Sequence, residues 1–271
     1  MSHLDSPVGT PHLGVTDFAA PAEAEATRGR QTHLEFLRAL HARLAPRFYL
    51  EIGIRHGNSL VLANCRALGV DPAPEIGALL AATIQVVSQT SDDFFAQRAD
   101  DLLSAGLDLA FIDGMHWFEF ALRDFLNIER RAHPGTVVVF DDIFPGHPWQ
   151  AARDRRTRVW TGDIWKIVVC LRKYRPDLLL IPCDTWPTGM LLVLGLDVAN
   201  HTLSRQYDRL VQEFVELDDG HIPACVLSRQ DAWAPDDPRI GTLLADVREA
   251  RESANPRSAI QTIVAAFRAA V

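Results

Sequence analysis

The sequence predicts an α/β fold, with a doubly wound, mostly parallel sheet of seven strands followed by a helical C-terminal extension. The main observation is that short apolar runs alternate with segments of helical periodicity along residues 32–174, which is typical of a parallel sheet covered by helices. A second observation is a pair of apolar runs on either side of residues 187–189, where Pro-Thr-Gly favours a turn. We therefore expect an antiparallel hairpin to complete the sheet.

The individual elements follow from the apolar spacing and from its interruptions. The first helix is expected from Thr32, because Leu37, Leu40 and Leu44 recur at helical spacing before Pro46. Strands are then expected at residues 48–52, 67–70, 83–87, 107–112, 136–140, 177–182 and 189–194. Further helices are expected at residues 60–68, 76–82, 118–131 and 164–174.

Three regions are expected along the chain. Residues 1–28 contain several prolines without apolar periodicity, which is typical of a flexible arm. Residues 29–200 hold the alternating elements and form the main domain. Residues 201–271 have helical periodicity as their only signal, so we expect them to cover the sheet or to form a homo-oligomer contact. The apolar face of this extension consists of Leu210, Phe214 and Leu217.

Composition narrows the class of protein. The chain has 271 residues and 48% hydrophobic content, as expected for a globular enzyme, and its net charge of −8 argues against a nucleic-acid partner. The four cysteines form no C-x-x-C pair, so we expect neither a zinc site nor a disulfide framework. We also expect a cytoplasmic location and no membrane partner, because no export signal and no apolar run of about 18 residues is present.

Several charged and aromatic residues are interpreted structurally. The basic run at residues 153–158 favours a solvated face over an anion-binding surface, and residues 162–166 indicate a helix start with Asp163 near its N-cap. Six histidines are expected at the surface: His33, His41, His133, His147, His201 and His221. Five tryptophans near the acidic motifs are expected mostly in the core, some of them lining a substrate pocket: Trp117, Trp149, Trp160, Trp165 and Trp186.

The turn after the first strand predicts a cofactor site. Gly53 and Gly57 allow the backbone to approach a ligand closely, and a following helix N-terminus would favour an anionic group. Asp71, at the end of the second strand, is suited to accept hydrogen bonds from ribose hydroxyls. The spacing is neither G-x-G-x-x-G nor that of a P-loop, and a plain strand-to-helix turn is the alternative.

Two further strand ends carry acids and an imidazole. Asp113 and His116 follow one buried strand, and Asp141 and Asp142 follow the next along the chain. Because the carboxyl ends of parallel strands lie side by side, these groups are expected to share one pocket. That arrangement predicts a divalent-metal site with a base beside it. As alternatives, Asp113 would cap a helix and the other two acids would begin a turn.

Over about residues 48–143 these features resemble the class I S-adenosylmethionine-dependent methyltransferases, and more closely the metal-dependent O-methyltransferases. The acid, two glycines and serine of the catechol-type first motif are matched by Glu51, Gly53, Gly57 and Ser59. By this resemblance, Glu51 would lie near the cofactor's amino group, Gly53 and Gly57 beneath the cofactor, and Ser59 at the methionine carboxylate. The resemblance also places Asp71 at the ribose, and Ser91 and Asp92 next to the adenine.

The resemblance extends to the catalytic centre. Asp113-x-x-His116 looks like the acid-x-x-histidine motif of the macrolide-sugar type, with His116 as base. Asp141-Asp142 differs from the Asp-Asn and Glu-Asp pairs of the two branches but keeps oxygen ligands. The resemblance thus implies Mg2+ held by Asp113, Asp141 and Asp142, with methyl transfer to a hydroxyl of a small molecule. A metal-independent small-molecule methyltransferase and a non-catalytic S-adenosylmethionine-binding protein are the alternatives.

Overall fold

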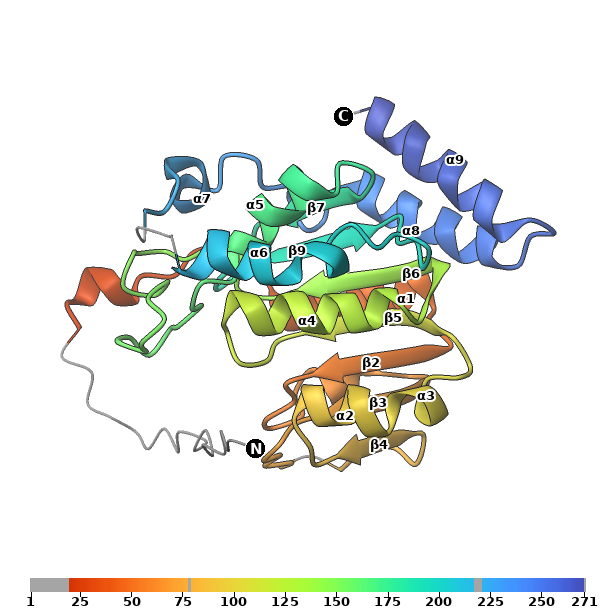
Figure 1. Cartoon of the computed structure of the whole chain (residues 1–271), viewed down its shortest axis with the longest axis horizontal. Helices are drawn as coiled ribbons and strands as arrows, with labels where there is room; N and C mark the ends of the chain where they lie inside the picture. Colours follow the sequence, from red (N-terminus) through yellow and green to blue (C-terminus); the bar gives the residue numbers. More distant parts are fainter. Residues whose placement is uncertain (1–19, 78, 217–220, 271) are drawn as a thin grey trace, which may run out of the picture.

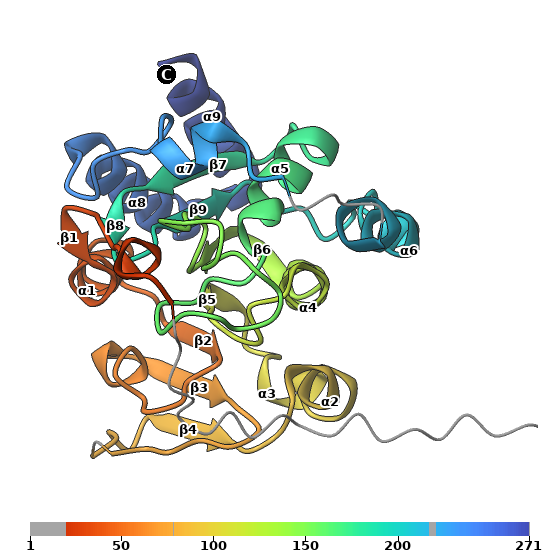
Figure 2. The same cartoon turned by 90° about the vertical axis from the view of Figure 1, so that its left-hand side faces the viewer.

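The structure is a computed structural model that describes residues 20–77, 79–216 and 221–270. Its central feature is a seven-stranded sheet of order β4-β3-β2-β5-β6-β9-β7, which runs from bottom to top in Figure 2. The strands are β2 (Phe48–Ile52), β3 (Arg66–Val70), β4 (Ile84–Val87), β5 (Leu107–Ile112), β6 (Ala132–Phe140), β7 (Leu179–Cys183) and β9 (Met190–Leu194). Only β9 runs antiparallel to its neighbours, so the predicted mostly parallel sheet with a final hairpin is confirmed.

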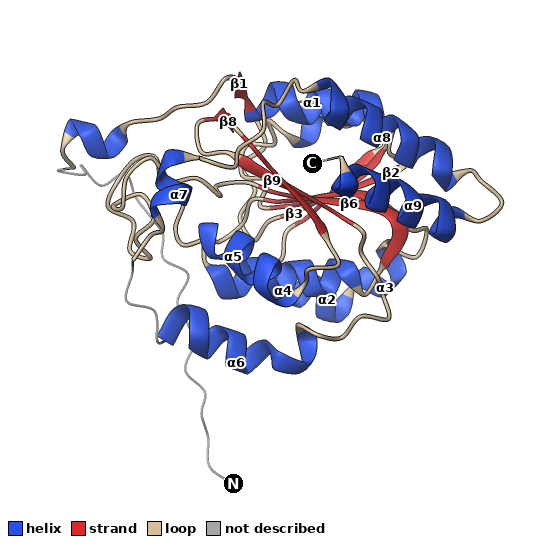
Figure 3. Cartoon of the chain, turned by 90° about the horizontal axis from the view of Figure 1, so that it is seen from above, coloured by secondary structure: helices blue, strands red, loops and turns tan. Residues whose placement is uncertain are grey.

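Helices cover both faces of this sheet (Figure 3). One face carries α1 (His33–Leu44), α8 (Pro238–Arg251) and α9 (Pro256–Ala269). The other face carries α2 (Ser91–Gln97), α3 (Ala99–Leu102), α4 (Phe118–Glu129), α5 (Trp165–Tyr174) and α6 (Tyr207–Val211). Each layer encloses its own apolar cluster against the sheet, and burial of this surface is the main stabilising term. The chain is therefore a doubly wound α/β protein, as the alternation predicts.

Local sequence accounts for the helix that precedes the sheet. Thr32 and Glu35 form a capping box, in which each side chain accepts a hydrogen bond from the other residue's backbone N–H. The buried side of α1 consists of Phe36, Leu37, Leu40, His41 and Leu44. The helix ends at Ala45, which adopts a left-handed conformation with φ of 43° just before Pro46.

Two predicted helices are wrong. In place of a helix over residues 60–68 there is a single 3-10 turn, η2 (Leu60–Leu62), because β3 already begins at Arg66 and leaves no room for more. No helix is present among the described residues of 76–82, where Glu75 N donates to Arg55 O at 2.8 Å and ties this segment to the turn after β2. Conversely, α2 was not predicted, although Thr90 caps it by accepting from Asp93 N.

The segments after β9 are helical, as predicted. They comprise η3 (Ser204–Gln206), α6, a π-helical turn (Gln212–Glu216), α7 (Ala224–Ser228), α8 and α9. Leu210 and Phe214 are buried, and the Phe214 ring lies 5.0 Å from that of Phe118 on α4. Leu217 lies outside the described residues. The two side chains therefore face inward as expected, against α4, while α8 and α9 of the extension contact β6 and cover the sheet. No helix in the described parts of the chain is long and apolar enough to cross a membrane.

Part of the expected arm packs against the domain. Residues 1–19 lie outside the described residues, but η1 (Ala22–Glu25) and its flanks contact the long loop between β6 and α5 (Figures 1 and 2). The amide of Gln150 donates to Ala24 O and Ala26 O, at 2.9 Å each. Farther on, β1 (Gln31–Thr32) pairs in parallel with β8 (Thr185–Trp186). The prediction of an arm over residues 1–28 did not foresee these contacts.

Candidate active site

The carboxyl ends of three adjacent strands bring the candidate site together. The register pairs Ile52 of β2 with Ile112 of β5, and Ile112 with Phe140 of β6. The next residue of each strand continues the ladder, since Asp113 N donates to Ile52 O at 2.8 Å and Asp141 N to Ile112 O at 3.1 Å. The two acidic strand ends therefore lie side by side, at the edge where ligands bind in open α/β sheets.

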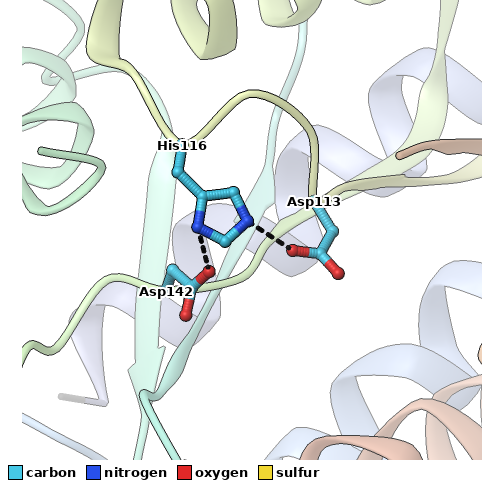
Figure 4. Close-up of side chains that lie close together, drawn as sticks. All are labelled: Asp113, His116 and Asp142. Carbon is cyan, nitrogen blue, oxygen red and sulfur yellow. Dashed lines mark ion pairs between the residues drawn. The ribbon is translucent and has the colours of Figure 1, made fainter. Parts of the chain in front are cut away.

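Asp113, His116 and Asp142 converge at this edge, as Figure 4 shows. One potential ligand atom from each lies within 4.8 Å of the others. His116 Nε2 is 3.5 Å from Asp113 Oδ1, and His116 Nδ1 is 3.1 Å from Asp142 Oδ2. Asp142 reaches this position because its backbone turns sharply after β6, with φ of 64°. Two carboxylates and an imidazole thus offer three candidate ligands for one cation.

Asp141, the third acid predicted as a ligand, is not part of this group. Its side chain is buried, and Oδ1 accepts a hydrogen bond from Asp142 N at 2.9 Å. The difference arises because consecutive side chains at a strand end point in different directions, and the turn at Asp142 decides which one faces His116. The structure therefore brings together Asp113, His116 and Asp142, with Asp141 immediately behind them.

The charges in this cluster are strongly coupled. Burial raises the pKa of the Asp141 carboxyl well above its usual range, and the charges of Asp142 and Asp113 raise it further. Burial also raises the pKa of Asp142. Although burial lowers the pKa of His116, the charges of Asp142 and Asp113 outweigh it and raise the value to about 9. The carboxylates of the cluster therefore favour the protonated, positively charged form of the His116 ring.

The loop between β6 and α5 also contacts His116. His116 has φ of 51°, a conformation that costs energy for a residue with a side chain. The carbonyl oxygen of His116 accepts a hydrogen bond from Asp163 N at 3.2 Å. Only glycine fits at position 162, because a Cβ there would lie 1.7 Å from this oxygen. Gly162 was not predicted as a site residue, and Trp160, which stacks on the imidazole, was expected in the core or lining a pocket rather than against His116, because no spacing in the sequence links either residue to His116.

Asp163 differs from its predicted role. Helix α5 begins at Trp165 with Ile164 as its N-cap, so Asp163 does not cap that helix. Instead, Asp163 Oδ1 accepts from Phe118 N at 2.7 Å, which satisfies a backbone donor at the start of α4. Its Oδ2 also pairs with Arg153 at 2.8 Å, so this member of the basic run is held by an acid. The contacts of Asp163 thereby fix the loop against the helix that follows His116.

The turn after β2 brings the predicted cofactor residues close to the acidic cluster. Gly53 has φ of 84°, and a Cβ there would lie 2.2 Å from Asp113 O, so only glycine fits between the two strand ends. Gly57 also needs glycine, with φ of 75°. Glu51 is fully buried and accepts hydrogen bonds from Tyr49 Oη at 2.8 Å and from the Ser59 hydroxyl. Burial raises the pKa of Glu51 to about 8.

Asp71 organises the same turn. Its Oδ2 accepts from Ile54 N at 3.0 Å and Arg55 N at 2.9 Å, while Oδ1 accepts from Ala73 N at 2.8 Å. The helix N-terminus expected at this turn is missing, because η2 is only one 3-10 turn. Backbone N–H groups at the turn instead donate to the Asp71 carboxylate. The prediction that a helix N-terminus favours an anionic group at this turn is wrong.

Ser91 and Asp92, the residues assigned to adenine, lie at the start of α2 against α4. Asp92 forms an ion pair with Arg123 at 2.6 Å. A cavity of about 270 Å³ lies elsewhere, beside the first residues of β2, β3 and β4. Because this cavity opens at the amino ends of the strands, it is separate from the site described above.

Comparisons with known proteins agree with this architecture. Residues 50–143, well under half of the chain, match the sequence profile of a family described as a methyltransferase domain. A comparison with curated proteins found no match. The matched residues run from β2 to the residue after Asp142, so they include Glu51, Asp113 and His116.

Three solved structures with a similar fold are described in turn. The chain is 20% identical to cofactor-bound Rv0187 from MTB, with a TM-score of 0.48 and coverage of 64% of this chain and 85% of that chain. It is 16% identical to the O-methyltransferase from Bacillus cereus in complex with SAH, with a TM-score of 0.48 and the same coverages of 64% and 85%. It is 19% identical to the O-methyltransferase TomG from Streptomyces achromogenes, involved in tomaymycin synthesis and solved with SAM, with a TM-score of 0.47 and coverages of 60% and 79%.

These identities and TM-scores are too low to carry an argument about what the chain binds. The profile match is independent of them and covers the strands that form the candidate site. The sheet has seven strands, mostly parallel, with the antiparallel hairpin expected for this fold. Over residues 50–143 the chain is similar to a methyltransferase domain, and the doubly wound topology of the sheet agrees with that match.

Proposed function

We propose that the chain is an S-adenosylmethionine-dependent O-methyltransferase that uses Mg2+ and His116 to methylate a hydroxyl group of a small molecule. The observation that carries this proposal is the convergence of Asp113, His116 and Asp142 at the carboxyl edge of the sheet, next to the glycine turn after β2. This turn lies within the stretch that matches a methyltransferase domain.

The residues around the turn fit the proposed cofactor. Gly53 and Gly57 give the turn its positive-φ backbone, and Glu51 offers a buried carboxyl that can pair with an ammonium group. The Asp71 carboxylate accepts hydrogen bonds from three backbone N–H groups. Because a carboxylate can accept about four hydrogen bonds, Asp71 can still accept one from a ribose hydroxyl. When bound, S-adenosylmethionine would supply an electrophilic methyl group on its sulfonium.

The donor set fits a hard divalent cation. Asp113 and Asp142 present carboxylate oxygens next to the two ring nitrogens of His116, and Asp141 is a further buried carboxyl nearby. Magnesium prefers oxygen ligands and keeps water or substrate in its remaining positions. Bound there, the cation would lower the pKa of a coordinated hydroxyl and would offset the repulsion among the acids.

His116 would then complete the chemistry from this chain. A hydroxyl is a weak nucleophile until its proton leaves, and an imidazole accepts that proton only in its neutral form. The carboxylates that raise the pKa of His116 to about 9 would be partly neutralised by a cation bound to them, which would favour the neutral ring. The two acids hold the ring between them, at 3.5 Å and 3.1 Å, so its position is set before the substrate binds. We assign His116 the role of general base and Asp113 and Asp142 that of metal ligands.

The test measures two quantities. The first is the binding of S-adenosylhomocysteine, and the second is the rate of methyl transfer, both in excess chelator and after Mg2+ has been added back. We expect Asp113→Asn and Asp142→Asn to keep binding S-adenosylhomocysteine but to lose Mg2+-dependent turnover across a panel of hydroxylated molecules. Asp101→Asn, on exposed α3, is the matched control and should behave as wild type. Full activity in excess chelator would favour the metal-independent alternative. Binding without any methyl transfer would favour the non-catalytic one.

A further inference from the structure

The imidazole of His116 has a second set of contacts, made by Trp160. The Trp160 ring is stacked on it, with 5.2 Å between ring centroids and 13° between the planes. The carbonyl oxygen of Trp160 also lies 2.8 Å from His116 Nδ1. One residue thus contacts both the face of the ring and one of its two nitrogens.

Trp160 is itself held firmly in place. Its indole Nε1 donates to Ala152 O at 2.6 Å, and the Arg155 guanidinium lies 5.9 Å from the ring centroid. The backbone just before it is fixed by Glu25, whose carboxylate accepts from Arg158 N at 2.8 Å and Val159 N at 3.1 Å. Hydrogen bonds therefore hold both the indole and the backbone just before it.

The hydrogen bonds decide which nitrogen of a neutral ring carries the proton. Two acceptors surround Nδ1, namely Trp160 O at 2.8 Å and Asp142 Oδ2 at 3.1 Å. Nε2 faces Asp113 Oδ1 at the longer distance of 3.5 Å. An imidazole with both acceptors at Nδ1 keeps its hydrogen there and leaves a lone pair on Nε2.

We propose that Trp160 is the positioning residue for His116. Its indole fixes the plane of the imidazole, and its carbonyl holds the Nδ1–H tautomer, so that Nε2 is the atom that accepts the substrate proton. This assignment of a proton-accepting atom rests on the proposed function, whereas the positioning of the ring does not. The inference reaches beyond the acid-x-x-histidine motif, because Trp160 lies 44 residues after His116 on a loop with no motif of its own.

The experiment compares Trp160→Leu with Trp160→Phe, which keeps a planar ring. The control is Trp149→Leu, which removes an exposed tryptophan from the same loop. We expect Trp160→Leu to lower kcat about 3- to 10-fold, in line with the loss of one aromatic contact, while cofactor affinity and KM change little. Trp160→Phe should recover most of the activity, and Trp149→Leu should be close to wild type.

A spectroscopic readout separates positioning from general support of the loop. In wild type, NMR of the His116 ring should show upfield ring-current shifts of its carbon-bound protons and, for the neutral ring, an Nδ1-protonated 15N pattern. Trp160→Leu should lose the ring-current shifts, and Trp160→Phe should retain part of them. Unchanged His116 shifts in Trp160→Leu would overturn the positioning role, whatever the activity. An Nε2-protonated neutral ring in wild type would overturn the tautomer assignment.

A double-mutant cycle with His116→Ala distinguishes this inference from the proposed function. If Trp160 acts through His116, then Trp160→Leu should cause no further loss in the His116→Ala background. Equal losses in both backgrounds would mean that Trp160 contacts the substrate directly, which contradicts the inference. If His116→Ala alone leaves methyl transfer intact, the general-base assignment fails, and the NMR comparison still decides whether Trp160 positions the ring.

Discussion

His41 is the clearest case in which a single residue departs from expectation. It was expected at the surface, yet its side chain is 3% exposed, and neither ring nitrogen has a partner among the described residues. Its ring packs edge-on against Tyr49, with 4.7 Å between centroids. The spacing did contain the signal, because His41 follows Leu37 by four residues and precedes Leu44 by three, which places all three on the buried face of α1.

This burial makes a prediction about acid stability. Burial lowers the pKa of His41 to about 4. Because the unfolded chain takes up a proton near pH 6.5, stability is complete above that pH and is lost as the pH falls toward 4. His41→Leu should reduce the difference in unfolding free energy between pH 7 and pH 4.5 by about 2 to 3 kcal/mol, measured by urea unfolding. An unchanged difference would show that His41 does not titrate as described.

Glu51 makes a prediction of the opposite sign. Its buried carboxyl has a pKa raised to about 8, so folding favours the neutral form and stability falls as the pH rises from about 4 toward 8. Glu51→Gln should therefore be more stable than wild type at pH 8, by about 1 kcal/mol or more, while the difference disappears near pH 5. The same variant should bind S-adenosylhomocysteine more weakly if Glu51 pairs with its ammonium group. Equal stability at both pH values, with unchanged binding, would contradict both roles.

Among the elements, the loop that carries Trp160 depends on the segment before β1. Glu25 accepts hydrogen bonds from two consecutive backbone amides in this loop, and Gln150 reaches back to Ala24 and Ala26. These contacts link a segment expected to be part of an arm to the residue that stacks on His116. Sequence alone gave no sign of them, because they join residues more than 120 positions apart.

Removing the Glu25 carboxylate should loosen this loop. In Glu25→Ala, the amide hydrogens of Arg158 and Val159 should exchange at least about tenfold faster, since each loses an acceptor worth about 1 kcal/mol or more. Hydrogen exchange read by mass spectrometry or NMR measures this directly, and Glu25→Gln, which keeps an acceptor oxygen, is the control. Exchange at the wild-type rate in Glu25→Ala would show that the loop is held by other contacts.

Strands were easier to predict than the connections between them. Residues 107–112 were predicted as a strand and form β5, because a buried central strand is a continuous apolar run. The helix expected at residues 60–68 is wrong for a different reason. Whether a short connection can hold a helix depends on where the next strand pairs, and the pairing of Phe48 with Arg66 leaves too little chain.

For the whole molecule, the place of the site could be predicted because strand order dictates it. Strands β5 and β6 are neighbours, so Asp113 and Asp142 had to lie at the same edge of the sheet. Which of the two consecutive acids would face His116 could not be predicted, because it depends on a left-handed backbone turn at Asp142. The contact between Trp160 and His116 could not be predicted either, because the path of a long loop depends on tertiary contacts.

The central claim is that Asp113 and Asp142 bind one divalent cation beside His116. The most direct measurement is the anomalous difference map of crystals of the full chain grown with Mn2+, an oxygen-seeking substitute for Mg2+, and S-adenosylhomocysteine. We predict a single strong peak between the Asp113 and Asp142 carboxylates, close to His116, that disappears in Asp142→Asn and remains in Asp101→Asn. A map with no peak at this position, or with the two carboxylates pointing apart at saturating Mn2+, would contradict the account.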